Sequence, residues 1–441
     1  MDKTQQKLES WCAAQGIEFV NKEAEEAYKQ RTKRIATAIQ LKKPDRVPVT
    51  PMMEFFYAKY TGASSYDVLY NADIAKRASR ETIVKLAPDA YESPFHFCTG
   101  RLFDALDIKQ LRWPGHGLPL SSAFQFVEGE YMKANEYEIL LRDPSDYMLR
   151  TFLPRVCGNL KAFEALSPIR NMFAYYTMYT QLAALGTQEG KEAINALVKT
   201  GEASLYYIQF IESFDKEMHA LGFPGQFGSY ALAPFDAIGD TLRGTHGMIL
   251  DMYRQPEVIK DACDKFVPLI LDMALSAARG SGHPCVFVPL HKGTASSRDG
   301  KGGFMSLKQF EEFYWPSLRK LILGLVDNGL VPNLFIEGDY TSRLEIIKDV
   351  PKGKCIFHFE QIDIHKAKKA IGDRVCIRGS VPIQLMCTAT PDEVKAYCKK
   401  LIDVLGEGGG FIMDISTASE DARPENMKAL IDFTKGYGVY K

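Results

Sequence analysis

Short apolar runs alternate with longer amphipathic stretches through the second half of the chain. Apolar runs of this length, each followed by a helical pattern, predict parallel strands joined by helices, as in repeated βαβ units. The predicted strands are residues 228–234, 284–290, 330–336, 354–359, 375–379 and 409–415. This half is therefore expected to form a parallel sheet covered by helices.

The first half of the chain has a weaker pattern. Residues 1–40 are charged, with apolar positions spaced for one helix face, and the run at 47–53 predicts a first buried strand. The section 60–220 is mainly helical in pattern, with shorter strand candidates at 90–92 and 108–113. Taken together, the elements predict an α/β protein, a (β/α)8 TIM-type barrel with an N-terminal helical extension.

Polar residues follow the predicted strands of the second half. In a (β/α)8 barrel the carboxyl ends of the strands converge on one mouth, so these residues are expected to lie together. They are His291-Lys292, Glu337-Gly338-Asp339, His358-Phe359-Glu360, Arg378-Gly379-Ser380 and Asp414-Ile415-Ser416-Thr417.

Composition and charge narrow the class of protein. The formal net charge of −1 gives no basic surface for nucleic acid. The amino terminus lacks the apolar core of a secretory signal, and the longest apolar stretch, at 266–278, is too short to span a membrane. Nine cysteines are scattered without a Cys-x-x-Cys pair, which is typical of reduced, buried thiols. We expect a cytoplasmic protein with no nucleic-acid or membrane partner.

Three groups of short motifs carry a resemblance to a known superfamily. They are Arg34-Ile35-Ala36-Thr37-Ala38-Ile39 with Lys43-Pro44-Asp45-Arg46-Val47-Pro48-Val49, Ile371-Gly372-Asp373-Arg374-Val375 with Gly379-Ser380-Val381-Pro382, and Arg423-Pro424-Glu425-Asn426-Met427-Lys428-Ala429-Leu430. In these motifs the chain resembles the uroporphyrinogen decarboxylase superfamily. The resemblance is closer to the corrinoid-dependent methyltransferase branch of that superfamily, which includes the methylcobalamin:coenzyme M methyltransferases and the chloromethane-utilisation relatives. The resemblance begins near Arg31, and it implies an N-terminal helical extension over 1–30 and a barrel over 31–441.

The chain departs from that superfamily at both of its known sites. Where the decarboxylases carry an Arg-Gln-Ala-Gly-Arg motif that holds substrate carboxylates, this chain reads Pro51-Met52-Met53-Glu54-Phe55-Phe56-Tyr57. Where the methyltransferase branch binds zinc through a His-x-Cys pair and a later Cys, the matching positions are Phe335, Glu337 and Ser416. The resemblance therefore implies neither porphyrinogen decarboxylation nor a zinc–thiolate site.

The predicted metal ligands are His291, Glu337 and His358, which follow three successive strands. Glu337 stands where the family has a ligand, and two histidines with a carboxylate can bind zinc or a harder divalent ion. The alternative interpretations are a loop carboxylate paired with Arg or Lys, and histidines satisfied by hydrogen bonds in a half-buried position.

Further strand-end residues are candidates for the chemistry. Glu360, Asp414 and Arg378 are predicted as catalytic residues, although Asp414 could instead cap the following turn. Lys292, Asp339 and Ser416 are predicted to contact substrate. The glycine-rich segment 293–303 is predicted to be a mobile loop over the mouth, and the aromatic-rich segment 172–179 is interpreted as helix core rather than as a ring-binding pocket.

The predicted function is methyl transfer with a cobalamin presented by a corrinoid protein, to or from a small oxygen-containing substrate such as a methoxy compound. A divalent metal at the mouth, for which zinc is the first candidate, would activate the substrate. Two alternatives stay open: a decarboxylase or lyase of a small carboxylated substrate, and a corrinoid-binding accessory protein without catalysis. A homodimer is implied by the resemblance alone.

Overall fold

The computed structural model describes residues 2–294 and 303–441, and its centre is a six-stranded parallel sheet of order β4-β5-β6-β7-β8-β9. The strands are β4 (Ser229–Tyr230), β5 (Cys285–Leu290), β6 (Val331–Asp339), β7 (Ile356–Gln361), β8 (Cys376–Arg378) and β9 (Phe411–Ile412). Each overlaps one of the six predicted strands, with β6 and β7 extending further. Residues 295–302 of the predicted mobile loop lie outside the described residues.

Two earlier segments close the sheet into a barrel. Val49 forms a parallel bridge with Met413, beside β9, and Tyr91 forms a parallel bridge with Gly225, just before β4. The N–H of Asp89 donates to the carbonyl of Val49 at 2.9 Å, which joins the two segments to each other. The ring therefore has eight members, and the predicted (β/α)8 barrel is confirmed.

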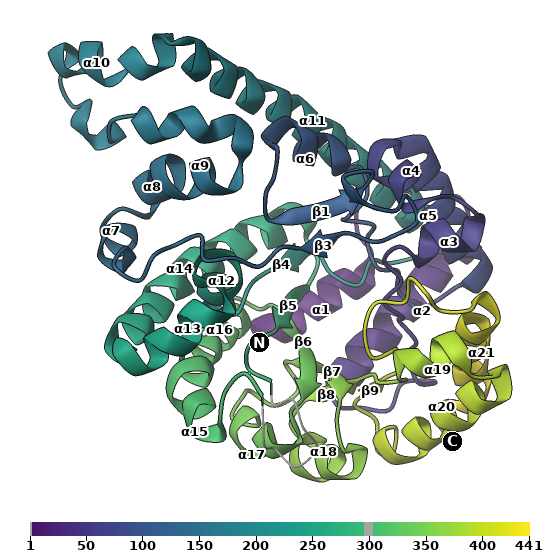
Figure 1. Cartoon of the computed structure of the whole chain (residues 1–441). Helices are drawn as coiled ribbons and strands as arrows, with labels where there is room; N and C mark the ends of the chain where they lie inside the picture. The colour runs from purple at the N-terminus through teal and green to yellow at the C-terminus, as the bar shows by residue number, and fades with distance from the viewer. Residues whose placement is uncertain (1, 295–302) are drawn as a thin grey trace.

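Helices surround this ring (Figure 1). After β4 they are α12 (Pro234–Ile238), η5 (Gly239–Arg243), α13 (Gly244–Arg254) and α14 (Pro256–Ser281); after β5, α15 (Leu307–Gln309), η6 (Phe310–Tyr314) and α16 (Trp315–Asp327); and then η7 (Thr341–Arg343), α17 (Leu344–Ile347), α18 (Ile364–Ile371), α19 (Ile383–Thr388), α20 (Pro391–Leu405) and α21 (Pro424–Tyr437). Local signals fix their starts: α20 begins at a capping box between Thr390 and Glu393, with Pro391 in its first turn.

The N-terminal helices α1 (Lys3–Ala13) and α2 (Lys22–Ile39) pack on the barrel. Leu8 and Trp11 of α1 share a buried cluster with residues near the starts of the barrel strands, among them Cys285, Val331 and Ile356. The extension therefore covers the amino end of the barrel, opposite the mouth. The domain boundary expected at residue 30 falls inside α2, and the division into 1–30 and 31–441 stays a prediction.

Two insertions follow the first two strands. The first contains α3 (Phe56–Thr61), α4 (Ser65–Tyr70) and α5 (Ala72–Leu86). The second contains α6 (Gly100–Leu106), β1 (Leu111–Pro114), β2 (Gly117–Leu118), β3 (Gln125–Phe126), α7 (Tyr137–Arg142), α8 (Pro144–Tyr147), η1 (Met148–Phe152), α9 (Leu153–Val156), η2 (Gly158–Ala165), η3 (Ile169–Asn171), α10 (Tyr175–Gln181), η4 (Ala183–Gly186) and α11 (Gln188–Ala220). The predicted strand at 108–113 is β1, which lies in a small separate sheet with β2 and β3.

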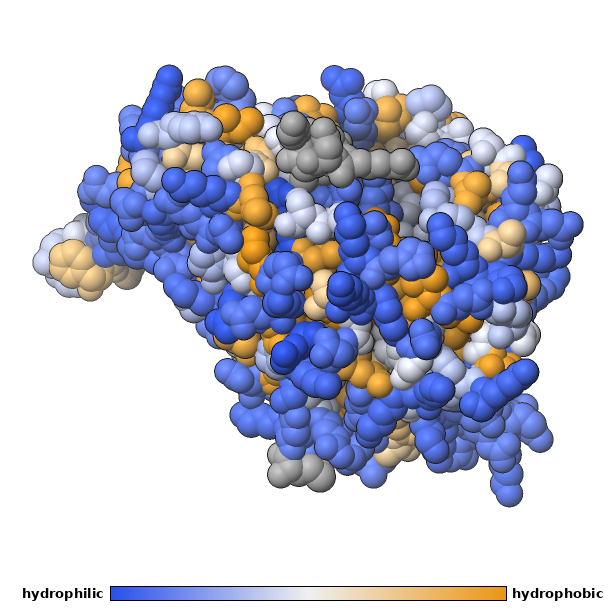
Figure 2. Space-filling model, turned by 90° about the horizontal axis from the view of Figure 1, so that it is seen from below, coloured by the Kyte–Doolittle hydropathy of each residue, from blue (hydrophilic) through white to orange (hydrophobic). Residues whose placement is uncertain are grey.

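Part of the second insertion projects from the barrel as a helical arm, with α10 near its end (Figure 1). We call residues 166–187, between η2 and α11, the arm tip. The aromatic segment at 172–179 lies here, and its interpretation as helix core is wrong: Phe173 is 84% exposed and Tyr179 is 73% exposed. Most of the face seen in Figure 2 is hydrophilic, as expected for a protein surface. Within the described ranges, no helix is long and apolar enough to cross a membrane.

Candidate functional site at the barrel mouth

His291 stands at the carboxyl end of β5 with acidic side chains around it. Its Nδ1 lies 2.6 Å from Oδ2 of Asp240, and its backbone N–H donates to Oδ2 of Asp236 at 2.9 Å. On the other side of the ring, Nε2 lies 3.6 Å from Oε1 of Glu337. Each nitrogen of the imidazole therefore faces a carboxylate.

Asp236 and Asp240 come from α12 and η5, which directly follow β4. Tyr314 donates its hydroxyl hydrogen to Oδ2 of Asp236 at 2.6 Å, which fixes that carboxylate. Potential ligand atoms of Asp236, Asp240 and His291 all lie within 4.8 Å of one another, a spacing that could hold a metal ion. Sequence reasoning missed both aspartates because the predicted strand ended at Pro234. The signal that could have found them is the one that identified the other candidates, namely a polar residue just after a predicted strand.

Lys292 places a positive side chain beside Asp240. It is buried, its Nζ lies 3.0 Å from Oδ1 of Asp240, and it donates a hydrogen bond of 2.8 Å to Oγ1 of Thr245. Gly239 makes room for the lysine, because a Cβ there would stand 2.8 Å from its Cδ. The predicted substrate ligand Lys292 thus contacts the aspartate that orients His291.

These contacts set the charge at the site. Burial disfavours the charged imidazolium, but Asp240, Asp236 and Glu337 outweigh it and raise the pKa of His291 to about 9. Burial raises the pKa of Asp236 to about 6. Burial also acts on Asp240, but His291 and Lys292 together lower the pKa of that carboxyl. These shifts favour an ionised Asp240 beside a protonated His291, and a cation that binds at Nε2 would displace the proton from that nitrogen.

Further carboxyl groups lie at the mouth. Glu337 keeps 43% of its side chain exposed, and Oε2 of Glu360 accepts the N–H of Gly338 at 2.6 Å. Glu54, in the turn after the first strand, has a left-handed backbone with φ of 39°, which is uncommon for a residue other than glycine. Burial raises the pKa of Glu54 well above its usual range, and nearby carboxylates including Glu92 and Glu337 act in the same direction.

Glu92 and Asp414 hold that turn in place. Oε2 of Glu92 accepts the backbone N–H groups of Met53 at 2.6 Å and Glu54 at 2.8 Å. Oδ1 of Asp414 accepts the N–H of Met52 at 3.0 Å. Both carboxyl groups are almost fully buried. Sequence reasoning missed Glu54 and Glu92 as site residues, although Glu92 ends the strand candidate at 90–92.

The structure places His358 below the mouth, away from the proposed ligand set. His358 is fully buried, it donates from Nε2 to the carbonyl of Ile415 at 2.8 Å, and its ring packs on Phe335. Glu360, two residues later on the same face, lies about 7 Å nearer the mouth, since a strand rises about 3.3 Å per residue. The structure brings His291 and Glu337 together but gives no support to His358 as their third ligand.

Arg378 and Asp414 form an ion pair in the same buried layer. Nε of Arg378 lies 2.6 Å from Oδ2 of Asp414, and the same guanidinium donates to the carbonyl of Thr50 at 2.9 Å and to Oε1 of Gln226 at 2.5 Å. These contacts fit a structural role better than the catalytic role predicted for both residues.

Asp339 and Ser416, predicted to contact substrate, make local hydrogen bonds. Asp339 accepts the N–H of Thr341 at 2.7 Å, and Oγ of Ser416 accepts the N–H of Ile383 at 3.0 Å. Each therefore stabilises the turn that follows its own or a neighbouring strand, and neither is held toward His291 by a contact in the described chain.

Comparison with known proteins agrees with this architecture. The family model for uroporphyrinogen decarboxylase (URO-D) matches residues 198–437, more than half of the chain. The chain belongs to the uroporphyrinogen decarboxylase family. The matched region of this family member contains β4 to β9 and all nine site residues predicted from the sequence, whereas Glu54, Glu92 and most of the arm lie before it.

Curated relatives in the family are distant. The chain is 22% identical to a uroporphyrinogen decarboxylase of Psychromonas ingrahamii, over 55% of this chain and 67% of that protein. It is 24% identical to the decarboxylase of Dechloromonas aromatica, over 50% of this chain and 59% of that protein. The matches thus span about three fifths to two thirds of these relatives. A methyltransferase from Methanosarcina mazei shares the fold, with a TM-score of 0.59 and 15% identity, over 92% of this chain and 98% of that one.

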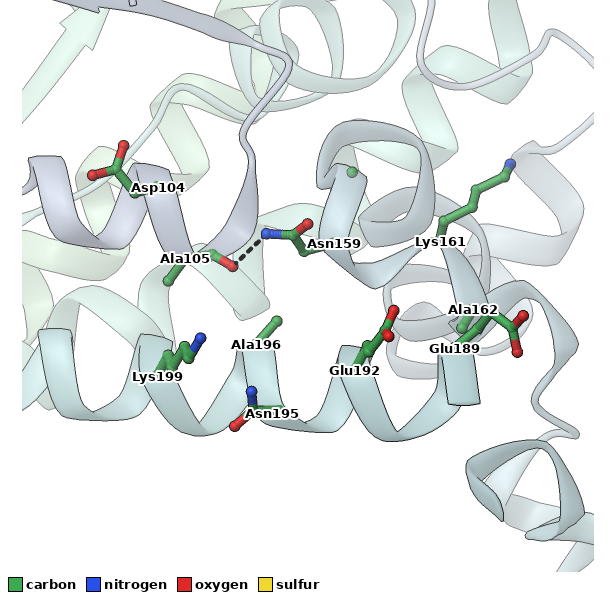
Figure 3. Close-up of a pocket in the computed structure, with 11 residues that line it drawn as sticks. Asp104, Ala105, Asn159, Lys161, Ala162, Glu189, Glu192, Asn195, Ala196 and Lys199 are labelled. Carbon is green, nitrogen blue, oxygen red and sulfur yellow. Dashed lines mark hydrogen bonds between the residues drawn. The ribbon is translucent and has the colours of Figure 1, made fainter. Parts of the chain in front are cut away.

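A separate hollow lies at the base of the arm. It has a volume of about 470 Å³ and lies between α6, η2 and α11 (Figure 3). Its wall is polar, with the Asn159 side chain donating to the carbonyl of Ala105 at 3.0 Å, and it includes none of the predicted site residues. The hollow is therefore separate from the residues that the sequence predicted for the mouth.

Proposed function

We propose that the barrel mouth transfers a methyl group between a small oxygen-containing substrate, such as a methoxy compound, and a corrinoid carried by a partner protein. The observation that carries the proposal is the arrangement of Asp240, His291 and Glu337, in which two carboxylates flank an imidazole at a strand end. The fold shared with the Methanosarcina mazei methyltransferase is consistent with it.

The donor set fits a divalent cation. We propose that His291 and Glu337 bind it, rather than the Asp236–Asp240–His291 group. Nε2 and the Glu337 carboxylate face each other at 3.6 Å in a partly exposed position, whereas Tyr314 and Lys292 already hold the two aspartates. Asp240 would then be the carboxylate that orients the ring from Nδ1, a common partner of metal-bound histidines. With oxygen and nitrogen donors in place of thiolates, such a cation would polarise a substrate oxygen rather than activate a thiol.

Side chains of the mouth can carry the remaining chemistry. The raised pKa of Glu54 favours its protonated form, so this carboxyl can give a proton to the substrate oxygen as the C–O bond breaks. The C–O electron pair stays on the oxygen, and the new bond to the methyl carbon takes its electron pair from the reduced corrinoid. Lys292 keeps Asp240 charged and in position beside His291.

Decarboxylation is the second candidate, since the curated relatives are uroporphyrinogen decarboxylases. The charges at the mouth oppose it. Among the described residues, Glu337 and Glu360 stand at the opening, Arg378 is already paired with Asp414, and Lys292 is paired with Asp240. Carboxylate groups of a substrate would be repelled there by Coulomb interaction.

The test is an anaerobic assay with chemically reduced cobalamin and a set of neutral methyl ethers and methoxyphenols, followed by the visible spectrum of methylcobalamin. We expect turnover that His291→Gln reduces at least tenfold, whereas Asp264→Asn, at an exposed carboxylate paired with Lys320, changes nothing. Metal content is measured on the same samples, and we expect one divalent ion per chain in the active protein.

The two alternative functions predict different results in this assay. Carbon dioxide release from a porphyrinogen or another carboxylated substrate, without bound metal, would replace methyl transfer by the decarboxylase alternative. Cobalamin bound without turnover of any methyl donor would indicate an accessory protein that kept the barrel and lost catalysis.

A further inference from the structure

Residues 127–132, which we call the bridging segment, attach the second insertion to the helical turn that carries Asp240. The chain between β3 and α7 crosses the helices that follow β4 (Figure 1). Arg243, the last residue of η5, donates from Nη1 to the carbonyl of Met132 and to Oε1 of Glu130, the latter at 2.5 Å. Arg243 is 2% exposed, so its guanidinium is held inside the protein. The bridging segment therefore has a fixed place beside this turn.

The bridging segment and the start of α13 come close together at a pair of glycines. Gly244, where α13 begins, has a positive φ of 68°, which glycine adopts without strain. A Cβ at this position would stand 2.9 Å from the carbonyl oxygen of Gly129, which is closer than side chains pack. Glycine thus allows the two backbones to lie directly against each other, and this brings the side chain of Glu128 to the barrel.

Glu128 is the carboxylate of the bridging segment that reaches Lys292. Its Oε1 accepts the backbone N–H of Thr245 and lies 3.6 Å from Nζ of Lys292, while the hydroxyl of Thr245 accepts a hydrogen bond from the same ammonium. Burial acts to raise the pKa of Glu128, but the hydrogen bond from Thr245 and the charge of Lys292 outweigh burial and lower the pKa. Glu128 is therefore ionised, and its charge acts on Lys292.

Lys292 consequently lies between two carboxylates. Oδ1 of Asp240 is 3.0 Å from its Nζ, and Oε1 of Glu128 is 3.6 Å from the same atom. The other oxygen of Asp240, Oδ2, is the one that contacts Nδ1 of His291. The side chain of Lys292 is only 10% exposed, so solvent screens its interactions weakly. The attraction between Lys292 and Asp240 therefore competes with the hydrogen bond to His291, and Glu128 takes up part of that attraction.

We propose that Glu128 is a positioning residue of the mouth, which shares the ammonium of Lys292 with Asp240 and so leaves that aspartate free to hold the ring of His291. The proposal rests on the proposed function and deepens it, because it adds a residue of the second insertion to the site. Glu128 lies before residues 198–437, so the family match does not include it. Without the charge of Glu128, Lys292 would pair with Asp240 alone, and the bond between Asp240 and His291 would weaken.

The decisive variant is Glu128→Gln, and the bridging segment supplies its matched control in Glu130→Gln. The two side chains are 46% and 54% exposed, and each accepts a hydrogen bond from the barrel, Glu128 from Thr245 and Glu130 from Arg243. Only a role through Lys292 distinguishes them, because a purely structural role would make both variants behave alike. Glu128→Asp keeps the charge and should restore most of what Glu128→Gln loses.

The nuclear magnetic resonance signal of the His291 Nδ1 hydrogen measures the bond to Asp240 directly, in the full chain without added metal or substrate. A hydrogen in a short, charge-assisted bond resonates far downfield, and Asp240→Asn, which removes the carboxylate, assigns the signal. We expect Glu128→Gln to move the signal upfield and Glu130→Gln to leave it in place. The proposal is overturned by an unmoved signal in Glu128→Gln, by equal movement in both variants, or by the lack of such a signal in the wild-type protein.

Affinity for Zn²⁺ gives a second measurement, which separates this proposal from the metal site of the proposed function. Titration calorimetry should show an affinity lower by roughly three- to tenfold in Glu128→Gln, less than the roughly 10- to 100-fold for a group that contacts a metal ligand, and unchanged in Glu130→Gln. If the wild-type protein binds no Zn²⁺ while the His291 signal still responds to Glu128→Gln, the metal site fails and the positioning role stands. If Zn²⁺ binds with equal affinity to the wild-type protein and to Glu128→Gln, the positioning role fails and the metal site stands.

Discussion

His291 and Asp240 share a hydrogen bond of 2.6 Å between Nδ1 and Oδ2, which joins the end of β5 to the helical turn after β4. Because the carboxylate holds one ring nitrogen, the other is directed toward Glu337. The two strand ends thereby act as one unit, and a substitution at either end is expected to disturb the other.

Asp240→Asn is expected to weaken binding of a divalent cation by roughly 10- to 100-fold, as for other losses of a carboxylate that orients a metal-bound histidine. An amide keeps the size of the side chain but removes the charge that fixes the ring. Titration calorimetry with Zn²⁺ measures the affinity, with Asp264→Asn as control. Equal affinities for wild-type protein and Asp240→Asn would contradict this orienting role.

Glu337→Gln is expected to reduce cation affinity at least as much as Asp240→Asn, because it removes a proposed ligand rather than its supporting group. Its melting temperature without metal should stay close to that of the wild-type protein, since 43% of the side chain is exposed and contributes little packing. Unchanged metal content together with unchanged activity would show that the position has no part in the site.

Arg378→Met is expected to destabilise the fold by about 3–5 kcal/mol, the usual cost of leaving one member of a buried ion pair unpaired. Asp414 is fully buried and has its guanidinium partner 2.6 Å away. Urea unfolding measures the loss. The exposed ion pair between Lys320 and Asp264 offers the control, because Lys320→Met should lower the free energy of unfolding by less than about 1 kcal/mol. A fully stable Arg378→Met that lacks activity would restore the catalytic role.

Glu92 is expected to make stability fall as pH rises from about 4.5 to 7. Burial raises the pKa of Glu92 to about 7, and the charge of Asp414 acts in the same direction. The backbone hydrogen bonds from Glu54 and Met53 and the charge of Arg378 lower the pKa but do not outweigh burial. The folded protein therefore binds this proton more tightly than the unfolded chain does. The resulting stabilisation is fully present below the pKa of Glu92 in the unfolded chain, and it is lost as the pH rises through the pKa of Glu92 in the folded protein.

The comparison variant for that prediction is Glu92→Gln, which keeps an acceptor for the two backbone N–H groups and cannot ionise. Relative to it, the wild-type free energy of unfolding should decrease by up to about 1.4 kcal/mol per pH unit across this window. Urea unfolding at several pH values measures the difference. Parallel stability curves for the two proteins would mean that Glu92 does not change its protonation there.

The sequence alone determined the barrel strands and the polar residues at their ends. Strand patterns are local, because apolar runs and the helices between them depend on neighbouring residues, so β5 to β9 could be placed to within a few residues. Since parallel strands end at one rim, the order of the strands along the chain was enough to expect His291 and Glu337 near each other.

Only the tertiary structure decided which side chains share the site. His358 and Glu360 face the same way on β7, and the register of β7 against β6 decides that His358 lies beside Phe335, buried below the rim, whereas Glu360 reaches Gly338 at the rim. Asp240 reaches His291 through the path of a helical turn, which no local pattern encodes. The arm tip has the composition of a core helix and is exposed, because burial depends on what packs against a segment and not on its own residues.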